Sequence, residues 1–227
     1  MGRILFVFTS TAQTLTGAQA GWYLPEAVYP YYVLSPHHDI DFAAPKGPNP
    51  PMDESSRELF QDDECVRFLN DEIVKNKLDN AFKLSEVSAQ DYDAIFHIGG
   101  YGPVLDLASD SAGIKLVSDF YRAGKVTSAV CHGSAALVNA TDASGKPIVQ
   151  GKAVTGFSNA EKEQVSQAKE TPFLLEDKIK SLGGLYEKAP ELWGAKVVVS
   201  GNLITGQNPA SARGVGEAIL QALPRTQ

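Results

Sequence analysis

The chain has 227 residues, of which 43% are hydrophobic and 21% charged, enough for one α/β domain with a substantial buried core. Its net charge of −7 argues against nucleic acid or an anionic membrane as a partner, because either would need a basic patch. The two cysteines, Cys65 and Cys131, stand in different contexts, which argues against a disulfide framework and favours a reducing compartment.

The chain begins with an apolar run, residues 4–8, directly after Met1-Gly2-Arg3. This run is too short for the apolar part of a signal peptide followed by a cleavage site, and far too short to cross a bilayer. We therefore interpret it as the first strand of a cytoplasmic protein.

Apolar runs of strand length alternate with segments of helical periodicity, a pattern typical of βαβ units around a parallel sheet. The predicted strands are Ile4–Thr9, Asp39–Ala43, Ala94–Ile98, Val126–Val130 and Ala153–Phe157, with a hairpin from Lys196 to Thr205 that turns at Gly201-Asn202. The predicted helices are Gly113–Ala123, His132–Ala140, Asn159–Ala168 with Asn159 as N-cap, Pro172–Leu182 and Pro209–Leu223. We expect residues 1–227 to form a single α/β domain with a rigid, proline-rich insertion loop near residues 45–53.

Glu26 lies in an aromatic, proline-broken stretch, residues 22–31. An acid among so many apolar neighbours is expected to be partly buried, which would raise its pKa and let it hold or move a proton. Spacing alone, however, favours a solvated glutamate on the exposed side of a short helix.

Paired glycines, Gly99 and Gly100, follow the predicted strand Ala94–Ile98. Such glycines can present backbone N–H groups to a developing oxyanion, and the alternative is a tight turn without chemistry. The segment holds only fragments of a G-x-G-x-x-G motif, and no acidic residue follows at the expected distance. We therefore predict no nucleotide cofactor.

Cys131 comes directly after the predicted strand Val126–Val130, and a helix-forming segment of small residues follows it. This arrangement is typical of a strand-to-helix nucleophile elbow. A thiol at a helix N-terminus with His132 beside it is expected to have a lowered pKa, whereas the alternative is a buried, unreactive cysteine. Cys65 follows three acidic residues, 62–64, so we expect its pKa to be raised and its thiol to be unreactive.

The histidines offer no metal site, because none of them has zinc-ligand spacing together with the cysteines. The four are His37, His38, His97 and His132. We predict neither a metal nor any other cofactor.

Five segments, in the right order, give the chain a resemblance to the PfpI-like, class I glutamine amidotransferase-like superfamily. Residues Ala129–Gly133 resemble its nucleophile elbow, and Pro25–Ala27 its glutamate segment. The loop 45–53 and the segments 154–159 and 205–211 resemble one branch, the glutathione-independent glyoxalases and heat-shock chaperones. The resemblance implies a flavodoxin-like α/β/α sandwich with a mostly parallel central sheet, and frequent homodimers.

The resemblance also implies an activity, that of a glyoxalase III-type lyase or D-lactate dehydratase. In such an enzyme the Cys131 thiolate attacks the aldehyde carbon of methylglyoxal or a related 2-oxoaldehyde to give a hemithioacetal, without glutathione or metal. N–H groups near Gly100 and His132 stabilise the oxyanion, while His132 and Glu26 move protons towards a D-lactate-type product. The alternatives are a redox-sensing or stress-chaperone (holdase) protein with an oxidisable Cys131, and a cysteine hydrolase acting on another carbonyl.

Besides a mild departure at Ser134, where proline is common after the elbow glycine, two residues depart from the pattern of this branch. Lys162 stands where its members have the acid that orients the histidine, and a lysine cannot accept an imidazole N–H. Glu161 or Glu163 could replace that acid only if the helix began at a shifted position. Tyr101 stands where a histidine is usual, within a Gly-His-Gly pattern. Both departures predict reduced glyoxalase turnover without changing the fold or the role of Cys131.

Overall fold

The central sheet has the strand order β3-β2-β1-β4-β5-β9-β8, and all neighbouring strands are parallel except β9 and β8, which are antiparallel. The structure, a computed structural model, describes residues 2–165 and 168–223. The strands are β1 Arg3–Val7, β2 Asp39–Ala44, β3 Phe82–Lys83, β4 Ala94–His97, β5 Val126–Val130, β8 Val197–Ser200 and β9 Leu203–Gly206. The predicted α/β fold with a mostly parallel, flavodoxin-like sheet is confirmed.

The middle strands β1, β4 and β5 are buried along almost their whole length. Strands covered on both faces are continuous apolar runs, and this is why the sequence predicts them within one or two residues. The predicted turn at Gly201-Asn202 joins β8 to β9, where Gly201 has a φ of +65°.

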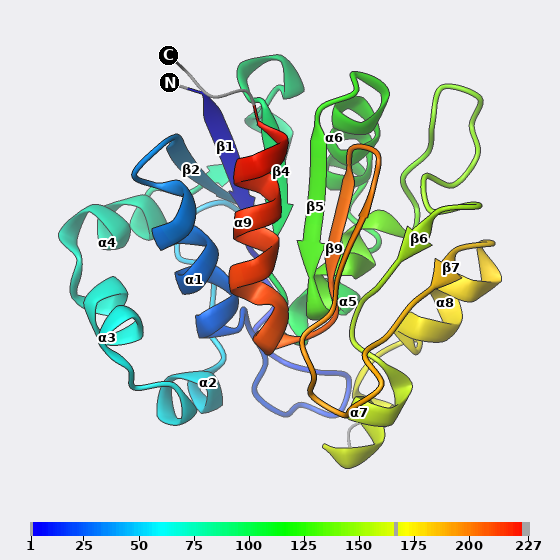
Figure 1. The fold of residues 1–227 in the computed structure, drawn as a ribbon. Helices are drawn as coiled ribbons and strands as arrows, with labels where there is room; N and C mark the ends of the chain where they lie inside the picture. The colour runs from blue at the N-terminus through cyan, green and yellow to red at the C-terminus, as the bar shows by residue number, and fades with distance from the viewer. Residues whose placement is uncertain (1, 166–167, 224–227) are drawn as a thin grey trace.

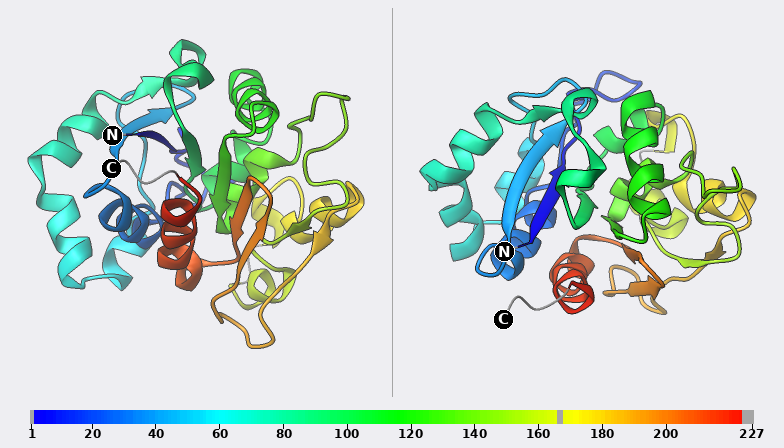
Figure 2. Two further views of the ribbon diagram at one scale, coloured as in Figure 1. Left: turned by 45° about the horizontal axis from the view of Figure 1, so that its top comes forward. Right: turned by 90° about the horizontal axis from the view of Figure 1, so that it is seen from above.

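Helices cover both faces of the sheet (Figures 1 and 2). The helices are α1 Leu24–Leu34, α2 Glu54–Leu59, α3 Asp63–Asn70, α4 Glu72–Asp79, α5 Gly102–Leu105, α6 Ser111–Arg122, α7 Asn159–Gln164, α8 Leu175–Ser181 and α9 Ala212–Ala222. In Figure 1, α1 and α9 lie side by side in front of the sheet, and the view from above in Figure 2 places α6 behind it. No helix in the described ranges is both long and apolar enough to cross a membrane.

Short 3-10 helices join several of these elements. They are Leu84–Glu86, Ala89–Asp91, Cys131–Leu137, Ala168–Glu170 and Pro209–Ser211. The predicted α-helix His132–Ala140 is therefore wrong in type, because the chain after the elbow winds more tightly and ends its 3-10 turns at Leu137. The predicted helix Pro209–Leu223 begins with one such turn before α9.

The predicted strand Ala153–Phe157 extends only over Ala153–Val154 (β6), which pairs with Leu185–Tyr186 (β7) in a separate two-stranded sheet. The following residues leave the sheet because they turn inward: the N–H of Phe157 donates to the carbonyl of Cys131 over 3.3 Å. This turn brings residues 155–158 to the back of the elbow.

The helix predicted at Asn159–Ala168 begins at Asn159, but its N-cap differs from the predicted one and it ends sooner. Ser158 is its N-cap, in place of Asn159, because Ser158 forms a reciprocal capping box with Glu161. The α-helix ends at Gln164, Ala168 starts a separate 3-10 turn, and residues 166–167 lie outside the described residues. The helix predicted at Pro172–Leu182 begins at Leu175.

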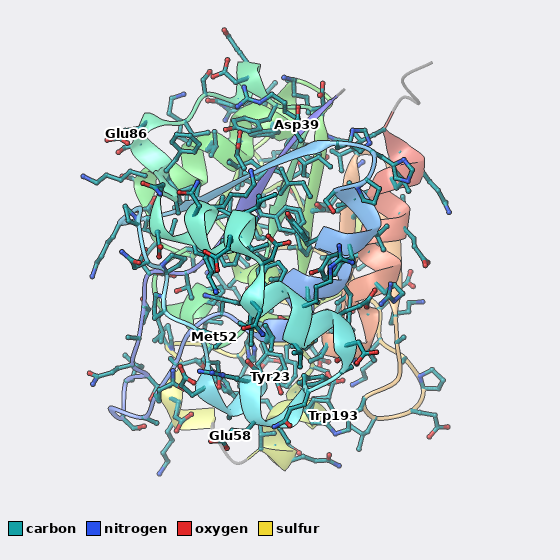
Figure 3. The ribbon with its side chains drawn as sticks, turned by 90° about the vertical axis from the view of Figure 1, so that its left-hand side faces the viewer. Tyr23, Asp39, Met52, Glu58, Glu86 and Trp193 are labelled. Carbon is teal, nitrogen blue, oxygen red and sulfur yellow. The ribbon has the colours of Figure 1, made fainter. Side chains whose placement is uncertain are left out.

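The proline-rich segment 45–53 forms a loop, as expected, and it is fixed at its end. The indole N–H of Trp22 donates to the carbonyl of Pro50 over 3.0 Å, and Asp53 caps α2 by accepting the N–H of Ser55. Figure 3 shows Tyr23 and Met52 towards the lower end of the molecule, where β1, β4 and β5 end in Figure 1, while Asp39 lies at the opposite end.

Candidate active site

Cys131 follows β5 at a sharp turn and has a φ of +57°, a left-handed conformation that is rare outside glycine. The chain can pack this closely after the turn because Gly133 has no side chain: a Cβ there would collide with the carbonyl of His97 at the end of β4. A strained, non-glycine residue at a strand-to-helix turn is the geometry of a nucleophile elbow. Cys131 therefore stands at a turn of this kind, and its role as nucleophile stays a prediction.

The predicted lowering of the Cys131 pKa is wrong. Cys131 is 4% exposed, and burial together with the neighbouring Glu26 raises the pKa of the thiol, although the backbone N–H groups of His132 and Gly100 act against this rise. His132 supplies no positive charge, because its own pKa is lowered well below 6.5. At neutral pH the sulfur is therefore held as a thiol.

Glu26 lies in the first turn of α1 and is completely buried, so the spacing-based expectation of a solvated glutamate is wrong. Neither carboxyl oxygen has a hydrogen-bond partner within the described residues. Burial raises the pKa of Glu26 to about 8, while the nearby thiol of Cys131 and the N–H of Gly99 act in the opposite direction. The side chain is thus mainly a carboxylic acid at neutral pH, beside the candidate nucleophile.

Gly99 and Gly100 leave room for this pair of residues. A Cβ on Gly99 would collide with Oε2 of Glu26 and lie 2.8 Å from the Cβ of Cys131. Gly100 has a φ of +103°, and its N–H acts on the Cys131 thiol. The close approach of backbone expected at these glycines is present, while their role towards an oxyanion stays a prediction.

His132 packs between two aromatic rings. Its ring centroid is 4.3 Å from that of Phe157 and 5.1 Å from that of Tyr101. Nδ1 lies 3.7 Å from Sγ of Cys131, and this is the one hydrogen bond that the ring forms within the described residues. Burial and the charge of Lys162 lower the pKa of His132, so the imidazole is neutral.

Glu161 lies within the helix cap and forms no hydrogen bond with His132 in the described chain. Its Oε2 accepts the N–H and hydroxyl of Ser158, and its Oε1 accepts the side-chain amides of Gln207 and Asn208. Both carboxyl oxygens of Glu161 thus accept hydrogen bonds that hold α7 to the segment after β9. Glu163, the other candidate acid, is exposed.

Lys162 has different neighbours from Glu161, because successive side chains on a helix leave it about 100° apart. It is 3% exposed, and its Nζ lies 4.1 Å from the centroid of the Tyr101 ring. The side chains predicted as auxiliary, Tyr101 and Lys162, are therefore both close to His132, whereas Glu161 serves the cap.

A cavity of about 180 Å³, large enough for a small molecule, is lined by the site residues Glu26, Tyr101, Cys131 and His132 among others. Sequence reasoning missed several of its lining residues. Tyr23 comes directly before α1, and Trp193 lies in the loop before β8, near the same end of the molecule as Tyr23 in Figure 3. Trp193 has a φ of +63° and donates its indole N–H to Gln164. Nothing in the local sequence marks either residue, because their place comes from the fold.

No group of three or more histidine, cysteine, aspartate or glutamate side chains is placed to bind a metal ion in residues 2–165 and 168–223. Cys65 is a buried residue of α3, where burial and Asp62 raise its pKa to about 12. The expected inert character of Cys65 agrees with this environment.

Relatives with assigned activities resemble this chain over nearly its whole length. It is 30% identical over 217 residues to the glutathione-independent glyoxalase HSP31 of Saccharomyces cerevisiae, covering 91% of each chain. It is 28% identical over 233 residues to glyoxalase 3 of Candida albicans, covering 98% of each.

Solved structures agree with the sequence relatives. The rapid encystment protein of 24 kDa from Francisella tularensis matches with a TM-score of 0.92 and 35% identity, over 98% of this chain and 99% of that one. Glyoxalase III of Candida albicans matches with a TM-score of 0.88 and 26% identity, over 99% and 98% of the two chains. The DJ-1/PfpI family matches residues 20–222, so this chain belongs to the DJ-1/PfpI family.

Proposed function

We propose that this protein is a glutathione-independent glyoxalase III that converts methylglyoxal or a related 2-oxoaldehyde to a D-lactate-type hydroxy acid. The observation that carries the proposal is the buried pair of Cys131 and Glu26, which meet across Gly99 at a small cavity. Glyoxalases among the relatives of the chain support the substrate class.

Cys131 carries the first step in this proposal. Its sulfur forms a bond to the aldehyde carbon, the C=O π bond opens, and the thiol proton ends on the new hydroxyl oxygen. The N–H groups of Gly100 and His132, which already act on the sulfur, stabilise the oxyanion before it is protonated.

Glu26 carries the second step. A pKa of about 8 keeps both of its protonation states accessible near neutral pH, as general acid–base catalysis requires. The carboxylate takes a proton from the former aldehyde carbon, and the electron pair moves to give an enediol. Protonation at the adjacent carbon then gives a thioester, which water cleaves to the hydroxy acid and the thiol. One substrate carbon is oxidised and the other reduced, so no external hydride carrier is needed.

The test is D-lactate formation from methylglyoxal by the purified protein without glutathione. Cys131→Ala should lose turnover, since it removes the attacking sulfur. Cys65→Ala is the matched control and should keep it, because Cys65 lies outside the cavity and has no part in the steps above. Wild-type turnover no higher than that of Cys131→Ala would contradict the proposal.

Redox sensing is the second candidate function. The observation that favours it is the protonated Glu26 carboxyl beside Cys131, because such a group can donate a hydrogen bond to a sulfinate. Peroxide separates the two candidates: oxidation of Cys131 ends the activity of a glyoxalase but switches a sensor on.

Three finer points stay predictions from the sequence. They are the reduction of turnover by Tyr101 and Lys162, the homodimer and the cytoplasmic location. The holdase and hydrolase alternatives gain no specific support from the contacts of the described residues.

A further inference from the structure

Lys162 is a buried amine without a hydrogen-bond partner in the described chain. It is 3% exposed, and burial lowers its pKa to about 8, so it still carries its charge at pH 7. The contact it makes there is with the face of the Tyr101 ring, 4.1 Å away. A buried, unpaired ammonium destabilises a fold, so its presence beside the cavity points to a role in the site.

Neither of the nearby carboxylates, Glu161 and Glu170, pairs with Lys162 within the described residues, so its charge acts on the site. The next residue back, Glu161, is fully engaged in the α7 cap. Glu170 acts on Lys162 electrostatically from the 3-10 turn Ala168–Glu170, yet Nζ of Lys162 forms no hydrogen bond with it within the described residues. The charge of Lys162 also interacts electrostatically with Cys131 and with His132.

The neutral His132 must carry its one proton on either Nδ1 or Nε2. Nδ1 faces the sulfur of Cys131, while His132 and Lys162 line one small cavity together with Phe157. An ammonium has three donors and no acceptor, so it repels an imidazole N–H and attracts the lone pair of the ring. A carboxylate in the same place would favour the opposite tautomer.

We propose that Lys162 is a positioning residue that holds neutral His132 with its proton on Nδ1, so that the imidazole donates a hydrogen bond to the Cys131 sulfur and to the anion formed beside it. The catalytic consequence rests on the proposed function: His132 then stabilises charge, and Glu26 performs the proton transfers at carbon. The tautomer itself is a property of the resting protein and can be measured without turnover.

The first test is nitrogen NMR of the histidine rings in protein labelled with nitrogen-15, at pH 7. The wild type should show His132 neutral with its proton on Nδ1. Lys162→Met, which keeps a long apolar side chain and removes the charge, should lose this preference. Lys162→Glu should move the proton to Nε2 and shift the titration of His132 to higher pH. Lys152→Met, at an exposed lysine, is the control and should match the wild type.

Two NMR results would overturn the inference: a wild-type His132 that carries its proton on Nε2, or a Lys162→Met spectrum identical to that of the wild type. Loss of folding does not obscure the test, because Lys162→Met removes a buried charge and should unfold at a higher temperature than the wild type.

The second test separates this inference from the proposed function. If the wild type forms D-lactate, Lys162→Met should lower kcat by about tenfold or more, because a histidine in the wrong tautomer cannot serve the reaction. KM should change little, since Lys162 does not line the main cavity. A wild type that forms no D-lactate but shows the predicted tautomer would contradict the proposed function alone. Unchanged kcat in Lys162→Met would contradict the catalytic consequence.

Discussion

Burial sets the charge of each acid–base group in this site. It raises the pKa of Glu26 and of Cys131 and lowers that of His132, so at neutral pH the site holds a carboxylic acid, a thiol and a neutral imidazole. Lys162 retains the positive charge. The sequence predicts a thiolate stabilised by a helix and a histidine, and it fails here because desolvation outweighs both.

The raised pKa of Glu26 predicts a pH-dependent stability. The folded protein binds this proton more tightly than the unfolded chain, so the stabilisation is complete below pH 4.5 and is lost as pH rises towards about 8. The free energy of unfolding of the wild type relative to Glu26→Gln should therefore fall between pH 5 and pH 8, with a slope of up to about 1.4 kcal/mol per pH unit. Urea unfolding at several pH values measures this difference, and a difference independent of pH would refute the buried acid.

At the scale of elements, the site is made by two neighbouring strand ends and one helix start. β4 ends before Gly99 and β5 before Cys131, while Glu26 follows Pro25 in the first turn of α1 and its carboxyl lies against Gly99. α1 is held close to α9, where a Cβ on Gly216 would lie 2.9 Å from the Cα of Pro30. The position of Glu26 thus depends on helix packing as well as on its own turn.

Gly99→Ala tests this arrangement. The new methyl group would collide with the Glu26 carboxyl and with Cys131, and neither can move freely in a packed core, so we expect a loss of about 2 kcal/mol or more in unfolding free energy. Gly145→Ala is the comparison: its φ is +80° but its Cβ would meet no atom within 4 Å, so it should cost about 1 kcal/mol. Equal losses in chemical denaturation would mean that the turn at Gly99 is not tightly packed.

At the scale of the whole molecule, the sequence predicts elements with a regular apolar pattern and misses features that are fixed by contacts between distant residues. The runs that form β1, β4 and β5 are readable because both faces are buried. Helices α2, α3 and α4 were not predicted, although aspartates at 53, 62 and 71 cap them and could have signalled their starts.

Local sequence likewise reveals only part of the site. Cys131 and the paired glycines stand at strand ends, where local pattern reveals them. The burial of Glu26 depends on the packing of α1, and the place of Trp193 on a loop that crosses to α7, so neither follows from local sequence. The capping box of Ser158 with Glu161 sets where α7 begins, and this register decides that Glu161 serves the cap and Lys162 lies near Tyr101.

The central claim is that Cys131 and Glu26 act as a pair, and the D-lactate turnover of Glu26→Gln tests it most directly. The amide keeps the shape of the side chain but can neither accept nor donate the acid proton, so kcat should fall by about a hundredfold or more, in a variant at least as stable as the wild type at pH 7. A Glu26→Gln enzyme that forms D-lactate at close to the wild-type rate would contradict the account.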